Sequence, residues 1–203
     1  MEKENIQKYK NKAKASFKTK KNLFVFYLAI NKELKISDLS FDEFKITDNL
    51  VKLYTSEYWQ QELDYTINGL KISEIEKRIN IIENENIELF TQLEKEYIAS
   101  FSNIFPESDF DKLLLINECH YCKITVDEIE QLGNRKLLFK KNLRGWNLEI
   151  DRINSNYEYF PENCVMSCYW CNNAKTDEFT EAEFLKIGVE IKKIWKDRLN
   201  DFR

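Results

Sequence analysis

The apolar positions in the first half of the chain recur at the spacing of α-helices. Six of them lie on one helical stripe: Ile75, Ile79, Ile82, Leu89, Leu93 and Tyr97. Ser73 followed by Glu76 has the pattern of a capping box, and Pro106 ends the stretch, so we expect one long helix that runs to Ile104. Residues 41–70, rich in Phe, Tyr, Trp and Leu, are expected to supply the helices that pack against it.

Asn86 interrupts this stripe with a polar side chain. In a coiled coil, a single asparagine at a core position fixes the register and the number of strands. Two interpretations are therefore open. The helix pairs with a second copy of the chain, or it packs on its own domain, which is the more common use of an amphipathic face.

The pattern changes near residue 113, where shorter elements replace the long helix. Asp127 to Leu132 is expected to form a helix that Gly133 ends. Leu137 to Lys141 and Leu148 to Ile153 have the composition of strands, and the loop between them contains Arg-Gly. We expect these two strands to pair as a β-hairpin.

A second capping box, Thr180 with Glu183, begins the last element. The apolar residues behind it have helical spacing: Phe184, Ile187, Ile191, Trp195 and Leu199. The chain is therefore predicted to be an α+β protein. A mostly helical N-terminal region at 1–112, of unknown role, precedes a smaller mixed domain at 113–203.

The composition of the 203 residues is that of a globular, helix-rich protein, with 43% hydrophobic and 33% charged residues. Only four glycines and two prolines argue against a turn-dense β-sandwich. The longest apolar run, Leu23 to Ile30, is too short to span a bilayer. It also lies too late for a signal peptide and lacks a cleavage site. We expect a cytoplasmic protein without a membrane partner.

Four of the five cysteines form two Cys-x-x-Cys pairs, Cys119 with Cys122 and Cys168 with Cys171. Two intervening residues let one tight turn present both thiolates to Zn²⁺, and four thiolates complete a tetrahedron, so the ion would be structural. Cys164 could compete with Cys168 for the fourth position. A redox dithiol would need a thioredoxin-like context, which is absent.

Basic residues are unevenly distributed, although the net charge is −4. Residues 1–21 carry eight lysines and two glutamates, and contact with phosphate and an ordinary solvated face explain this stretch equally well. Residues 134–144 contain no acid, and there we expect contact with phosphate. The predicted nucleic-acid-binding residues are Arg135, Lys136, Lys140, Lys141 and Arg144.

The two cysteine pairs enclose further polar residues in a recognisable order. The motifs are Cys119-x-x-Cys122, Leu148-Glu149-Ile150-Asp151-Arg152-Ile153, Glu162-Asn163 and Cys168-x-x-Cys171-Asn172-x-x-Lys175. From Cys119 to Phe184 the chain resembles the HNH, or ββα-metal, endonuclease family. The resemblance implies a zinc-bound ββα-metal domain that cuts phosphodiester bonds with a second, catalytic cation.

The resemblance also implies roles for individual residues. Asp151 and Asn172 would hold one Mg²⁺ or Mn²⁺ through a carboxylate and an amide oxygen, which are the ligands that such hard cations prefer. Asn163 would brace the loop between strand and helix, and Lys175 could meet a phosphate. Arg152 completes the predicted catalytic set.

Arg152 departs from the family pattern, because it stands where the family has its general-base histidine. Arginine stays protonated and cannot accept a proton from water. Four alternatives remain open. A tyrosine (Tyr157 or Tyr159) or Glu149 could be the base, His120 could reach the site from the first cysteine pair, or water activated by the cation could attack without a protein base while Arg152 clamps the phosphate.

Three functions are consistent with these observations. The leading one is an HNH-type endonuclease acting on nucleic acid, with DNA as the expected substrate, in restriction, phage defence or a mobile element. The second is a catalytically degenerate HNH-fold module that only binds nucleic acid. The third is an interaction scaffold, in which the N-terminal helices form a homodimer or contact a partner protein.

Overall fold

The computed structural model describes residues 3–139 and 144–200, and these form two compact units. One unit comprises Ile6–Ile104 with Asn156–Glu158. The other comprises Phe105–Ser155 and Tyr159–Arg203, together with the N-terminal end of the chain. Helices dominate, and the two sheets have two strands each, so the predicted α+β class is confirmed. The predicted domain limits at 1–112 and 113–203 stay predictions.

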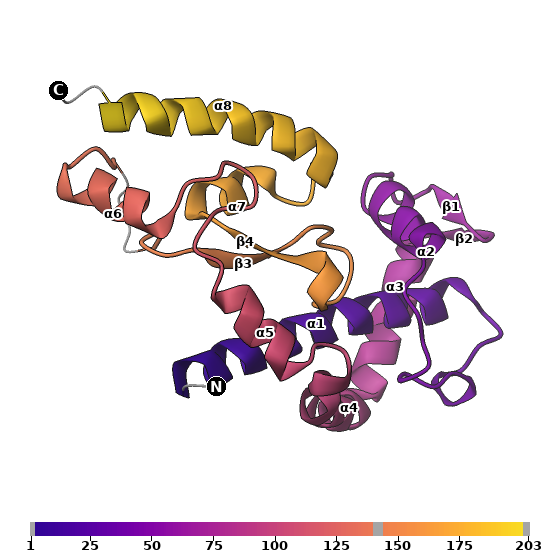
Figure 1. The fold of residues 1–203 in the computed structure, drawn as a ribbon. Helices are drawn as coiled ribbons and strands as arrows, with labels where there is room; N and C mark the ends of the chain where they lie inside the picture. Colours follow the sequence, from indigo (N-terminus) through magenta and orange to yellow (C-terminus); the bar gives the residue numbers. More distant parts are fainter. Residues whose placement is uncertain (1–2, 140–143, 201–203) are drawn as a thin grey trace. The chain divides into compact units, whose positions relative to one another are not determined.

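The N-terminal unit is built mainly from helices (Figure 1). Its elements are α1 (Lys3–Ile30), η1 (Ile36–Asp38), α2 (Asp48–Lys52), the π-helical turn η2 (Leu53–Tyr58), β1 (Thr66–Ile67), β2 (Leu70–Lys71), α3 (Ile72–Glu85), α4 (Ile87–Ser100) and η3 (Phe101–Asn103). The strands β1 and β2 pair antiparallel. The prediction that residues 41–70 are helical holds only for α2 and the turn that follows it.

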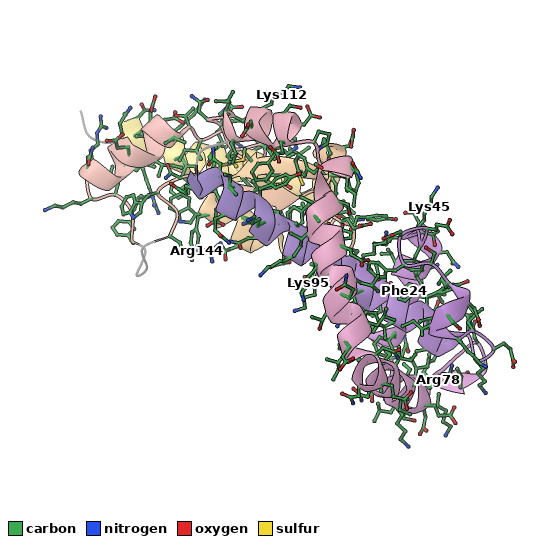
Figure 2. All side chains as sticks on the ribbon, turned by 90° about the horizontal axis from the view of Figure 1, so that it is seen from below. Phe24, Lys45, Arg78, Lys95, Lys112 and Arg144 are labelled. Atoms are coloured by element: carbon green, nitrogen blue, oxygen red, sulfur yellow. The ribbon has the colours of Figure 1, made fainter. Side chains whose placement is uncertain are left out.

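The apolar run at the end of α1 lies in the core of this unit. Phe24, which is labelled in Figure 2, belongs to this run. It packs edge-on against Phe41 and Phe44, with ring centroids 5.2 Å apart in both pairs. Arg78 donates hydrogen bonds to the carbonyl oxygens of Ala29 and Leu28 and so satisfies backbone acceptors that the helix end leaves open. Among the described residues, no helix is long and apolar enough to cross a membrane.

The predicted long helix is wrong in one respect, because it is broken at Asn86. This residue leaves the helical region (φ −123°, ψ 27°), and its side-chain amide donates to the carbonyl oxygen of Ile82. The break follows from the tendency of asparagine to bond to nearby backbone groups. The first capping box is also shifted, since the helix begins at Ile72 and Glu74 accepts from the amide of Lys71. Asn86 therefore ends α3 instead of setting a coiled-coil register.

The C-terminal unit contains the cysteine motifs. Its elements are α5 (Glu107–Leu114), α6 (Val126–Asn134), β3 (Glu149–Arg152), η4 (Pro161–Asn163), β4 (Cys164–Ser167), α7 (Tyr169–Lys175) and α8 (Glu181–Asn200). Figure 1 shows α7 between the β3–β4 hairpin and α8. Trp170 of α7 packs against Trp195 of α8, with ring centroids 4.8 Å apart. The second capping box is confirmed, because Glu183 and Thr180 exchange hydrogen bonds at the start of α8.

The partner strand of β3 differs from the prediction. Residues 137–139 are not in a strand, and Lys140 and Lys141 lie outside the described residues. Instead, β3 pairs antiparallel with β4, so that Asp151 faces Val165 and Arg152 faces Cys164. Strand β4 leads directly into the second cysteine pair. The hairpin and α7 are thus continuous in the chain and come together at the cysteines.

Candidate active site and metal centre

The four predicted zinc ligands form one buried cluster. The sulfur atoms of Cys119, Cys122, Cys168 and Cys171 all lie within 4.8 Å of one another, and all four residues are fully buried. The Sγ atoms of Cys122 and Cys168 are 3.6 Å apart. A tetrahedron with bonds of about 2.3 Å to zinc has edges of about 3.8 Å, so this spacing fits a cation at its centre. Cys164 is buried but does not belong to the cluster, which removes it as a fourth ligand.

Short-range backbone bonds shape each cysteine pair for this purpose. In the first pair, the amide of Cys119 donates to Ile124 O and the amide of Lys123 to Cys119 O. Lys123 takes a left-handed conformation with φ 57°, which closes the turn. In the second pair, Cys168 is the N-cap of α7, and its sulfur accepts from the amide of Cys171. Both turns therefore direct two sulfurs to one point.

All five cysteines are free thiols, and the charge of the cluster favours a cation. Hydrogen bonds from Cys122 and the other cysteines lower the pKa of the Cys119 thiol. Interaction with Cys119 in turn raises the pKa values of Cys168 and Cys171. The raised pKa values keep Cys168 and Cys171 protonated beside the Cys119 thiolate, because four thiolates at this distance would repel one another without a positive ion between them. The cluster could therefore hold a metal such as zinc.

Asp151 lies on β3 and points toward α7 and the first cysteine pair. Its Oδ2 accepts a hydrogen bond from the hydroxyl of Tyr121 at 2.8 Å and lies 3.7 Å from the ammonium of Lys175. Lys175 is only 1% exposed and donates a hydrogen bond of 3.0 Å to the carbonyl oxygen of Arg152. Burial raises the pKa of Asp151, and Lys175 and Tyr121 oppose this shift. Both neighbours therefore favour the charged form of the carboxylate, against the effect of burial.

Glu149 lies on the same side of β3 as Asp151, two residues earlier, because side chains alternate along a strand. Its Oε2 accepts from the Nδ2 of Asn172 at 2.7 Å. Arg144 donates to both carboxylate oxygens of Glu149, each at 2.9 Å. The next residue, Gly145, has a φ of 89°, which favours glycine, and a Cβ atom at this position would lie 2.8 Å from the Cβ of Tyr169. The site thus contains two carboxylates from β3, with an amide and an ammonium from α7.

Asn163 is buried at the end of the loop that joins β3 to β4, directly before β4 begins. Its Nδ2 donates to Asn154 O, and its Oδ1 accepts from the amide of Asn154. Its own carbonyl oxygen accepts from the amide of Ile153. These three hydrogen bonds hold the end of the loop against the residues that directly follow β3.

The candidates for a general base have different surroundings. The guanidinium of Arg152 lies over the ring of Tyr159, at 4.7 Å. Tyr157 donates to Asp48, and burial, with this contact, raises its pKa to about 12, so it does not accept a proton at neutral pH. His120 is hydrogen-bonded through Nε2 to Glu181 at 2.7 Å. Among these candidates, Glu149 is hydrogen-bonded to Asn172, the predicted amide ligand of the second cation.

The predicted phosphate-binding residues are only partly described. Arg135 is exposed and donates to the carbonyl oxygen of Leu199, and Lys136 is exposed in a left-handed turn with φ 57°. Arg144 is paired with Glu149, as described above. Lys140 and Lys141 lie outside the described residues. Contact of these five side chains with nucleic acid stays a prediction.

The contact of Tyr121 with Asp151 was not predicted from the sequence. This side chain is buried between the first two cysteines and bonds directly to Asp151, so the metal cluster and the carboxylate share one segment. Gly188 of α8 makes room for the backbone of Tyr121, because a Cβ atom at that position would lie 2.5 Å from Tyr121 O. The spacing of Tyr121 within the cysteine pair carries no signal for this contact.

Known proteins resemble this chain over about half of its length. No protein-family model matches the chain. The uncharacterized protein R423 of Acanthamoeba polyphaga mimivirus is 30% identical over 98 residues, which is 48% of this chain but only 15% of that protein. The solved structure of the rare-cutting HNH restriction endonuclease PacI is 28% identical. That match covers 46% of this chain and 66% of the PacI chain, with a TM-score of 0.39.

Proposed function

We propose that the chain is a metal-dependent endonuclease that hydrolyses phosphodiester bonds of nucleic acid, with DNA as the preferred substrate. One observation carries the proposal. The buried four-cysteine cluster joins β4 to α7, and beside it β3 and α7 bring Glu149 and Asp151 together with Asn172 and Lys175. We assign Zn²⁺ to the cysteines as a structural ion, because no ligand position remains open there.

We assign a second cation, Mg²⁺ or Mn²⁺, to Asp151 and Asn172. Tyr121 and Lys175 both contact Oδ2 of Asp151. We therefore assign the other carboxylate oxygen, Oδ1, as the atom that binds the cation. The Nδ2 of Asn172 donates to Glu149, which turns its amide oxygen away from that carboxylate. Oxygen donors of this kind suit a hard cation. When bound, the cation would stabilise the negative charge that develops on the phosphate and the leaving oxygen.

We assign the role of general base to Glu149. It is a carboxylate in contact with Asn172, whereas Tyr157 is held protonated. In this structure Arg144 donates hydrogen bonds to both carboxylate oxygens of Glu149. A phosphate that binds Arg144 would compete for the same donors, because guanidinium pairs equally well with phosphate, and would release Glu149 to accept a proton from water.

A specific observation favours a second candidate function, the catalytically degenerate nucleic-acid-binding module. Lys175 already supplies a positive charge 3.7 Å from Asp151, and Arg152 replaces the family's histidine. In that case Asp151 would serve only to hold the buried ammonium. The protein would then bind DNA with a strong salt dependence but would cut no substrate.

The cleavage of supercoiled plasmid DNA tests the two functions. The zinc-loaded protein is incubated with Mg²⁺ or Mn²⁺, and nicked and linear products are measured over time. We expect cleavage by the wild type, and its loss in Asp151→Ala and Asn172→Ala. Asn173→Ala is the matched control, because Asn173 is exposed and its side chain donates to the backbone of its own helix, at Tyr169 O. Cleavage that survives in Asp151→Ala would refute the assignment.

The base is tested separately. Glu149→Gln keeps the shape of the side chain but cannot accept the proton, so we expect the cleavage rate to fall by about 10²–10⁴ while DNA binding remains. An unchanged rate in Glu149→Gln would exclude Glu149 as the base. A wild-type protein that binds plasmid but does not cut it under any of these conditions would support the degenerate module.

A further inference from the structure

The exposed side of α1 carries a row of lysines. Tyr9, Ala13 and Phe17 are buried, and the rings of Tyr9 and Phe17 pack against Phe101 and Tyr97 of the N-terminal unit. Three exposed lysines lie at intervals of four residues, about 100° around the helix from this buried stripe: Lys10, Lys14 and Lys18. Residues four apart rise by about 6 Å along a helix, so the row spans about 12 Å.

The charge around this row is strongly one-sided. Residues 6–21 contain seven lysines and no acid. Residues 22–104 contain eight basic and fifteen acidic side chains. An ordinary solvated helix face mixes both signs, which stabilises it through pairs at four-residue intervals. The segregation on α1 therefore needs another explanation.

The arrangement is unfavourable for the isolated helix. Like charges at four-residue spacing destabilise a helix by about 0.2–0.5 kcal/mol per pair. Positive charges also oppose the dipole in the N-terminal half. Within the part of the chain that the structure describes, no ion pair involves Lys10, Lys14 or Lys18, whereas Lys21 is paired with Glu83 at 2.7 Å. The three ammonium groups are thus available to an anionic partner.

We infer that Lys10, Lys14 and Lys18 form a second nucleic-acid-binding surface, which contacts the phosphate backbone of duplex DNA. A regular row of positive charges matches a regular row of phosphates, and three lysines over about 12 Å face about three or four phosphates of one strand. The choice of duplex DNA as the partner rests on the proposed function. Such contacts position a duplex but carry no sequence information.

The surface is the outer edge of α1 and does not include the adjacent groove. Lys14 and Lys18 also border a groove that is lined by Glu83, Glu94 and Phe90. Carboxylates and an aromatic ring at this position do not suit a polyanion. The duplex would therefore lie against the exposed side of α1, away from these acids.

The test measures binding of the full, zinc-loaded chain to a labelled duplex of about 25 base pairs without added Mg²⁺ or Mn²⁺. Fluorescence anisotropy is recorded at several salt concentrations. Each lost phosphate contact reduces the slope of log affinity against log salt by about 0.9, so the triple variant Lys10→Ala, Lys14→Ala, Lys18→Ala should lose about 2.7 from it. Between ~50 and ~200 mM salt, the affinity of both proteins decreases, and the factor of decrease should be about 40 times smaller for the triple variant than for the wild type.

Control variants separate this surface from the general charge of the protein. Lys32→Ala, Lys45→Ala, Lys77→Ala removes three exposed lysines outside α1 and should leave the slope unchanged. Replacement of the three α1 lysines by arginine should also preserve the slope. Alanine favours the helix, so circular dichroism should show an intact fold for the α1 triple variant.

The inference is overturned if the α1 triple variant keeps the wild-type slope, or if the control triple loses as much. Stronger competition by single-stranded RNA than by unlabelled duplex would overturn the assignment to DNA. Failure of this surface is distinguishable from failure of the proposed function. Binding is measured without cleavage, and Asp151→Ala should retain the full slope even if no variant cuts DNA.

Discussion

Lys175→Met is the most informative perturbation of the site. Lys175 is 1% exposed, lies 3.7 Å from Oδ2 of Asp151 and donates to Arg152 O at 3.0 Å. Methionine has a similar length and keeps the packing, but it provides neither the charge nor the hydrogen bonds. The variant therefore leaves Asp151 as a buried carboxylate without its cation.

The expected loss of stability follows from this geometry. Removal of one partner from a buried ion pair costs about 3–5 kcal/mol. The side chain of Asp151 retains 13% exposure and the pair is long, so we expect a loss near the lower limit, about 3 kcal/mol at neutral pH.

The loss should depend on pH. Burial already raises the pKa of Asp151, and without Lys175 it rises further. A carboxyl whose folded pKa lies above its unfolded value contributes stability at low pH and loses it as the pH rises through the folded value. The effect of Lys175→Met should therefore be smaller near pH ~4 than at pH ~7.

Urea denaturation of the zinc-loaded protein measures this loss, because Trp146, Trp170 and Trp195 report on the C-terminal unit by fluorescence. Lys196→Met, at an exposed position of α8, is the control and should change the free energy of unfolding by less than about 0.5 kcal/mol. Mn²⁺ at ten times its dissociation constant should restore about 1.4 kcal/mol to Lys175→Met, because the cation takes the place of the ammonium beside Asp151. A loss no greater than in the control, or one that grows at low pH, would refute this reasoning.

Three further predictions concern the cysteine cluster and its link to Asp151. Cys171→Ser should reduce the zinc content of the purified protein from one ion per chain to a small fraction, measured by atomic emission; full zinc content would exclude Cys171 as a ligand. Tyr121→Phe should retain zinc but lower Mn²⁺ affinity about 10–100-fold in a titration, because the hydrogen bond that orients Asp151 is lost; unchanged affinity would make the bond irrelevant to the site. Gly188→Ala should destabilise the fold by about 1–3 kcal/mol in urea, since its Cβ would lie 2.5 Å from Tyr121 O; a neutral effect would show that α8 yields at this contact.

The cysteine cluster could be predicted from the sequence because its information is local. Two residues between cysteines fix a turn that presents both sulfurs, and four such ligands have one common solution. The second capping box at Thr180 is of the same kind, since Glu183 lies only three residues away. The clustering of the four sulfurs and the start of α8 therefore agree with the expectation.

Features that depend on distant parts of the chain could not be predicted in this way. The partner of β3 is β4, and the choice between this strand and residues 137–141 is decided by tertiary packing and not by strand propensity. The break of the helix at Asn86 could not be predicted, because the apolar residues before and after it recur at helical spacing. The bonds from Tyr121 to Asp151 and from Asn172 to Glu149 connect residues 30 and 23 positions apart, and no sequence pattern encodes them.

The binding of Mn²⁺ to the zinc-loaded protein, followed by electron paramagnetic resonance, tests the assigned catalytic cation most directly. The signal of free Mn²⁺ is recorded as protein is added, and the zinc content is determined in parallel. We predict one Mn²⁺ per chain for the wild type and for Asn173→Ala, and none for Asp151→Ala, with zinc unchanged in all three. Wild-type protein that binds no Mn²⁺, or Asp151→Ala that binds it equally well, would contradict a hydrolytic cation between β3 and α7.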